Sequence, residues 1–103
     1  MRLLMSHPEP SREGRFRRPA PRDRLLEEID ALAIELREAG ETTAAGRVPI
    51  AARADVLRAQ DAHRRAVIAL AAAGSAGELD AVGDALRESR RALDSARALL
   101  GRR

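Results

Sequence analysis

Residues 75–100 read SAGELDAVGDALRESRRALDSARALL, and this stretch decides the fold. Ser75 followed by Glu78 matches a capping box, the pattern that marks the start of a helix. From there apolar or small residues recur at alternating intervals of three and four, which is the period of an amphipathic helix. The stretch therefore predicts a helix over about residues 76–100 with one continuous stripe: Leu79, Val82, Leu86, Ser89, Leu93, Ala96 and Leu100.

A second helix is predicted immediately before it, over about residues 50–73. Pro49 suits its start, and only two or three residues link it to the next helix, so the two should form an antiparallel hairpin. We expect a coiled-coil-like seam between them, in which Leu79, Val82, Leu86, Leu93 and Leu100 meet Val56, Val67 and Leu70. This helix also has apolar residues on its opposite side, namely Ile50, Leu57 and Ile68. A helix with two apolar faces usually lies between two neighbours.

The first helix is predicted over about residues 22–39, with Gly40 as its stop. One apolar stripe runs along it, consisting of Leu25, Ile29, Leu32 and Leu36. We expect this helix to pack on the second face of the 50–73 helix, which completes an all-α fold of three helices over residues 22–103. Any apolar stripe that stays uncovered would bind a partner, and the stripe of the first helix is the first candidate.

Composition points to the same need for a partner. The chain has 103 residues, so it forms one domain at most, and 22 of its 46 apolar residues are alanine. Alanine buries little area, and the free energy gained by burial scales with apolar area. A small domain with so few large apolar side chains is expected to gain stability on a protein partner or in a homo-oligomer.

Residues 1–21 differ from the rest, because they hold four of the five prolines and show no helical period. We expect a disordered, basic N-terminal arm. Seven residues in and next to this arm could contact nucleic acid, with phosphates neutralised by arginine and a base stacked on the one aromatic ring. They are Arg12, Arg15, Phe16, Arg17, Arg18, Arg22 and Arg24.

Chemistry of other kinds finds no support in the sequence. There is no cysteine, no glycine-rich phosphate loop and no hydrolase motif. His63 has Ala59, Gln60, Ala66 and Val67 at the positions where a second metal ligand would lie, so we expect it and Gln60 to hydrogen-bond across a helix interface. We expect no catalytic residues, cofactor, metal or small-molecule substrate, no membrane association, and a cytoplasmic location.

The sequence thus favours a non-enzymatic helical module that self-associates or docks on a larger protein. The alternative is an arginine-arm protein that binds nucleic acid, in which the helices serve only for dimerisation.

Overall fold

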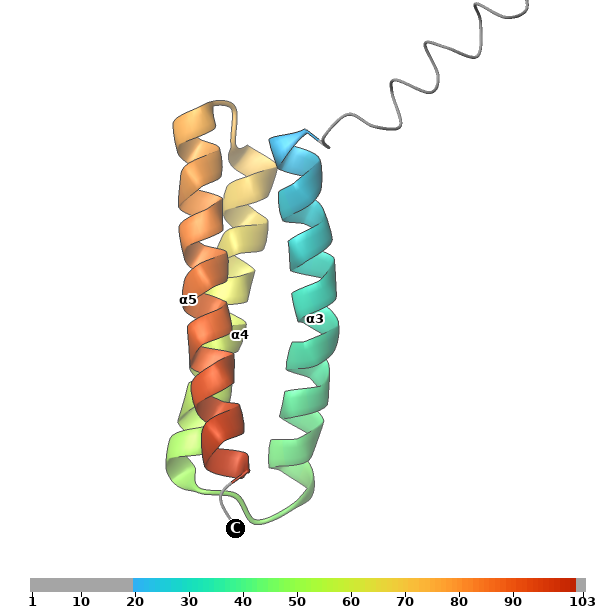
Figure 1. Cartoon of the computed structure of the whole chain (residues 1–103), viewed down its shortest axis with the longest axis vertical. Coiled ribbons are helices and arrows are strands. Elements are labelled where there is room, and N and C mark those ends of the chain that lie inside the picture. Colours follow the sequence, from blue (N-terminus) through green and yellow to red (C-terminus); the bar gives the residue numbers. More distant parts are fainter. Residues whose placement is uncertain (1–19, 102–103) are drawn as a thin grey trace, which may run out of the picture.

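The structure, a computed structural model, describes residues 20–101, and these form three helices with no strand among them (Figure 1). The helices are α3 (Pro21–Ala45), α4 (Ile50–Ala72) and α5 (Ala76–Leu100). They lie side by side along their lengths, and α4 runs antiparallel to both α3 and α5 (Figure 1). The predicted all-α class and the hairpin of the last two helices are confirmed, since α4 and α5 make the most extensive contact in the chain.

The turn between α4 and α5 is closed by the predicted capping box. The Glu78 amide donates a hydrogen bond to Ser75 Oγ at 3.2 Å, and the Gly74 amide donates to Glu78 Oε1 at 2.7 Å. Together these bonds satisfy backbone donors that have no partner within the helix. The hydrogen bond from the Gly74 amide, aided by the Ser75 hydroxyl, also lowers the pKa of Glu78.

The seam between α4 and α5 is built mostly on alanine. Val82, Ser89 and Leu93 of α5 are completely buried, and Ser89 Oγ donates a hydrogen bond to the carbonyl of Ala59 at 2.7 Å. A side chain as short as serine reaches a backbone atom of the other helix only if the two helices approach closely. Alanine permits this approach, and four alanines of α4 are completely buried: Ala52, Ala59, Ala62 and Ala66.

Most of the predicted seam residues lie in this core, with one exception. Val56, Leu70, Val82, Leu86 and Leu93 are buried, whereas Leu79 and Leu100 are partly buried near the two ends of α5. Val67 was predicted in the seam and is instead 43% exposed. The seam passes through the neighbouring Ala66, so Val67 is turned about 100° around the helix, away from α5.

Helix α3 covers the hairpin with the stripe that was predicted for it. Ile29, Leu32 and Leu36 are buried in a core shared with α4 and α5, and Leu25 packs against that core while partly exposed. The expectation that this stripe stays free for a partner is therefore wrong. In a bundle of three helices each helix turns its stripe toward the common axis, so the stripe of α3 is buried against the other two helices of the same chain.

Helix α3 ends at Ala45, so the predicted stop at Gly40 is also wrong. Gly40 does not adopt the left-handed conformation of a helix stop, because no glycine among residues 20–101 has a positive φ. A β-carbon at this position would lie only 3.1 Å from Nε2 of Gln60. Gly40 thus allows α3 to pass close to α4, and the helix continues to the buried Thr43.

Candidate interaction surfaces

The outer face of α4 holds three of the large apolar side chains that the fold leaves exposed. Ile50 is 86% exposed, Leu57 62% and Ile68 63%. These three residues form the face that was expected to receive the first helix. Helix α3 packs instead on the side of α4 next to α5, where its stripe contacts both helices of the hairpin. The second apolar face of α4 therefore has no neighbouring helix among residues 20–101.

The exposed apolar residues of this face belong to a regular repeat. Seven exposed positions follow one another at alternating intervals of four and three: Ile50, Ala54, Leu57, Asp61, Arg64, Ile68 and Ala71. This is the spacing of the seam positions of a coiled coil. We call this set the outer stripe of α4. By contrast, Ile34 on α3 is 61% exposed but has Asp30 and Glu38 as its neighbours one turn away, so it is an isolated apolar residue.

Two charged residues interrupt the outer stripe near its middle. Arg64 Nη1 lies 3.3 Å from Asp61 Oδ1, and Arg65 Nε lies 3.4 Å from Asp61 Oδ2. Arg65 also reaches α5, where its Nη2 lies 2.8 Å from Glu88 Oε2, and the hydrogen bond with Glu88 raises the pKa of Arg65. The centre of the stripe thus carries one carboxylate with two guanidinium groups, and apolar residues lie on either side.

A small apolar groove of about 300 Å³ adjoins the outer stripe between α3 and α4. Val67 faces this groove and lines it together with Leu26, Ile29 and Leu70. Ala71 belongs both to this groove and to the outer stripe. The apolar surface of α4 therefore extends sideways to α3 near the end of the bundle that holds the α4–α5 turn (Figure 1).

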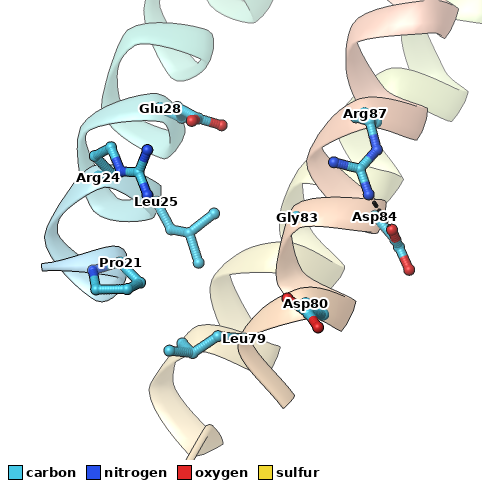
Figure 2. A pocket seen from close by; sticks show the side chains of 9 residues that line it. All are labelled: Pro21, Arg24, Leu25, Glu28, Leu79, Asp80, Gly83, Asp84 and Arg87. Carbon is cyan, nitrogen blue, oxygen red and sulfur yellow. Dashed lines mark hydrogen bonds and ion pairs between the residues drawn. The ribbon is translucent and has the colours of Figure 1, made fainter. Parts of the chain in front are cut away.

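An open groove of about 550 Å³ lies between the first halves of α3 and α5 (Figure 2). Leu25 points into the space between the two helices, and charged side chains surround it (Figure 2). Arg24 and Glu28 come from α3, and Arg87, Asp80 and Asp84 come from α5, with Arg87 paired to Asp84. The lining residues include no histidine, serine, threonine or cysteine, and their carboxylates are those of Glu28, Asp80 and Asp84. The groove thus offers mixed charges to water around one apolar side chain.

Helix α3 is held to α5 by a charged cluster beside the core. Arg90 donates from both terminal nitrogens to Glu35, at 2.7 Å to Oε1 and 2.9 Å to Oε2, and Arg97 Nη1 lies 2.9 Å from Oε1. The hydrogen bond from Arg90, with that from Arg97, lowers the pKa of Glu35 to about 2 although partial burial opposes the shift. The sequence analysis did not predict this cluster, although Arg90 and Arg97 lie one heptad apart and so share one flank of the stripe of α5.

The candidate nucleic-acid residues are only partly placed. Arg12, Arg15, Phe16, Arg17 and Arg18 lie outside the described residues. Arg22 donates hydrogen bonds to the carbonyls of Leu70, at 2.9 Å, and of Ala73, which caps the end of α4. Arg24 lines the groove of Figure 2. The guanidinium of Arg22 is thus used to fasten α3 to α4, and it does not lie in one patch with Arg24.

Two partly buried polar contacts fix α4 between its neighbours. His63 Nε2 donates a hydrogen bond to the carbonyl of Ile29 at 2.9 Å, which confirms the bond predicted for His63 across a helix interface. The Gln60 amide lies beside Gly40. On the other side Ser95 Oγ donates to Asp55 Oδ2 at 2.6 Å, and Asp55 also pairs with Arg58. Sequence reasoning missed Asp55, because aspartate is seldom buried and nothing in the sequence marks this one as an exception.

The described part of the chain offers no cluster of three or more His, Cys, Asp or Glu side chains that could hold a metal ion. Within residues 20–101, no helix has the length and apolar character needed to cross a membrane. Comparison of the whole chain with known protein families, with curated proteins and with solved structures finds no significant match.

Proposed function

We propose that the chain is a non-enzymatic interaction module that docks on another protein through the outer stripe of α4. The observation that carries this proposal is the exposure of Ile50, Leu57 and Ile68 at seam spacing. Single exposed apolar residues are common on soluble proteins, but large apolar residues that recur along one helix face at seam spacing are typical of a binding surface. The repeat spacing also indicates the shape of the partner, because such a row fits a second helix.

The rest of the described surface supports binding rather than catalysis. The buried polar groups of Asp55 and Ser89 and the half-buried imidazole of His63 each make a hydrogen bond between helices, so they serve the packing of the bundle. The open groove between α3 and α5 has no histidine, serine, threonine or cysteine among its lining residues, and water reaches its charged side chains. Within residues 20–101 the stripes of α3 and α5 pack into the shared core, whereas the outer stripe of α4 leaves three large apolar side chains exposed along one helix face.

A photo-crosslinking experiment tests this function. A benzophenone amino acid is placed at Leu57 in the outer stripe, and in a second variant at Ile34 of α3, which is equally exposed but isolated. Both variants are irradiated in the cells that make the protein. We expect a discrete covalent adduct with a polypeptide from position 57 and none from position 34.

The comparison between the two positions decides the outcome. An adduct of one defined mass from position 57 alone supports a docking face on α4. The absence of any discrete adduct from position 57, or the same diffuse products from both positions, would show that the outer stripe does not dock on a protein.

A further inference from the structure

The outer stripe of α4 is self-complementary when it is read in opposite directions. We infer that it binds a second copy of this chain, with the two α4 helices antiparallel across a two-fold axis at the level of residues 62 and 63. This inference rests on the proposed function, because it names the partner of the same docking face.

The register follows from the sequence of the stripe. In an antiparallel pair of identical helices, the residue numbers of two facing residues always add up to the same value. When this value is 125, every inner layer of the outer stripe joins two residues of the same kind or of opposite charge. Leu57 then faces Ile68 of the second copy, and Ala54 faces its Ala71. The two-fold axis generates each layer twice, as in every isologous interface. Each layer also combines the two kinds of seam position, which is the arrangement of antiparallel coiled coils.

The charges at the centre select this direction. With a sum of 125, Asp61 of one copy faces Arg64 of the other, and the axis repeats the pair. A parallel pair in register would place Asp61 against Asp61 and Arg64 against Arg64. Facing like charges are unfavourable, whereas facing opposite charges fix register and orientation at a modest cost in affinity. The same two residues that interrupt the apolar row thus specify how two copies align.

The residues beside the stripe are compatible with this pairing. Arg58 and Arg65 come close to each other between the two copies, but each already has a carboxylate partner within its own chain. Arg58 pairs with Asp55, and Arg65 pairs with Glu88. On the other flank Gln60 comes close to Val67 of the second copy, which would cover part of the exposed surface of Val67.

The strength of the pairing is limited by its size. Each copy contributes two large apolar side chains to the inner layers, while Ile50 lies at the end of the pair and faces the turn residue Ser75. Protein interfaces with so few large apolar contacts have little surplus after the loss of translational and rotational freedom. We therefore expect a dissociation constant in the micromolar range.

The first test measures self-association of the full chain by sedimentation equilibrium from about 1 to 500 µM, with interference optics because the chain has no Trp or Tyr. Ile68→Glu is compared with Ile34→Glu, which makes the same change at an equally exposed position outside the stripe. We expect Ile68→Glu to raise the dissociation constant at least about 100-fold, because both copies lose a buried side chain. We expect Ile34→Glu to leave it unchanged.

The second test determines direction and register. The chain has no cysteine, so Leu57→Cys and Ile68→Cys each introduce a single thiol. In the proposed pair the two copies of residue 57 are about 16 Å apart along the axis, well beyond the reach of a disulfide. Neither variant should form a disulfide alone under mild oxidation, and an equimolar mixture should form the mixed disulfide.

Each outcome decides the inference. A weak dimer that gives the mixed disulfide alone supports it, and a dimer linked through 57 and 57 overturns the antiparallel register. A chain that remains monomeric at 500 µM overturns self-pairing altogether. If position 57 still crosslinks to a different polypeptide, only this inference fails and the docking function stands. If the chain is monomeric and position 57 gives no adduct, both fail.

Discussion

Replacing Glu35 by glutamine should loosen α3 from the hairpin in a way that depends on pH. The carboxylate of Glu35 receives three close contacts from Arg90 and Arg97, and its pKa is about 2 in the folded chain against an ordinary 4.5. Glutamine keeps the shape and removes the charge. The change therefore isolates what the charge contributes to the free energy of unfolding.

The size of the effect follows from the pKa of Glu35. The lowering of this pKa from 4.5 in the unfolded chain to about 2 in the folded chain corresponds to an upper limit of about 3–4 kcal/mol. Glu35 is 28% exposed and both arginines are more exposed, so solvent screens the cluster. We expect Glu35→Gln to reduce the free energy of unfolding by about 1–2 kcal/mol at pH 7.

The sign of the pH dependence is fixed by the direction of the pKa shift. Because folding lowers the pKa of Glu35, its contribution is complete above the unfolded value of 4.5 and is lost as the pH falls toward about 2. The free energies of wild type and Glu35→Gln should therefore differ at pH 7 and converge near pH 2. Urea denaturation followed by circular dichroism at 222 nm, at one protein concentration, measures this difference.

Glu88→Gln provides the matched control, because it makes the same substitution in an ion pair between helices. Glu88 pairs with Arg65 at the exposed surface of α4 and α5, where solvent screens the pair strongly. We expect its denaturation curve to overlay that of the wild type at every pH. If Glu35→Gln behaved in the same way, or differed from the wild type by a constant amount from pH 7 to pH 2, the role given to the charged cluster would be wrong.

Three further predictions concern the hairpin. Leu86→Glu places a charge at a buried position, so the chain should lose its helical circular dichroism or melt at least 15 °C lower; unchanged melting would contradict the seam. Gly83→Ala should raise the free energy of unfolding by about 0.5–1 kcal/mol in urea titrations, since the added β-carbon would meet only Arg87 Nη1 at 3.7 Å. Gly40→Ala should raise it by less, because the β-carbon would be crowded by Gln60. Equal gains in the two variants would refute the close approach of α3 to α4 at Gly40. Ser75→Ala removes the cap of α5 and should lower the free energy of unfolding by about 1 kcal/mol in the same titration. An unchanged free energy of unfolding would show that the capping box does not stabilise the hairpin.

The sequence predicted the hairpin well because its signals are local. The capping box at Ser75 and the unbroken repeat from Leu79 to Leu100 need no knowledge of other parts of the chain. The same holds for the stripe of α3, whose residues were correctly grouped on one face. Local patterns of this kind establish which residues share a face, but they do not say which neighbour the face meets.

The partner of each face was therefore the point at which sequence reasoning failed. Helix α4 carries an alanine face and a face with Ile50, Leu57 and Ile68, and the presence of two apolar faces suggested that the second one receives α3. The structure uses the alanine face for both neighbours, because short side chains let two helices approach α4 at once. Gly40 shows the same effect, since a glycine that looked like a helix stop permits close packing against Gln60.

The sequence also gave little warning of the charged contacts between helices. Arg90 and Arg97 have Asp94 close by on α5, yet both arginines reach Glu35 on α3. Arg22 looked like part of a basic arm and instead binds the carbonyls at the end of α4. Long side chains can choose among several partners, and only the arrangement of the helices decides between them.

The alanine face of α4 has a consequence for how the protein tolerates change over evolution. At most buried positions a smaller residue leaves a cavity and a larger one of similar chemistry is the milder replacement. At Ala59 and Ala66 this order is reversed, because any larger side chain must push α5 away and break the contact between Ser89 and the Ala59 carbonyl. Homologous chains that keep this bundle should therefore vary at these positions only among alanine, glycine and serine, while large apolar residues drift freely among one another elsewhere in the core.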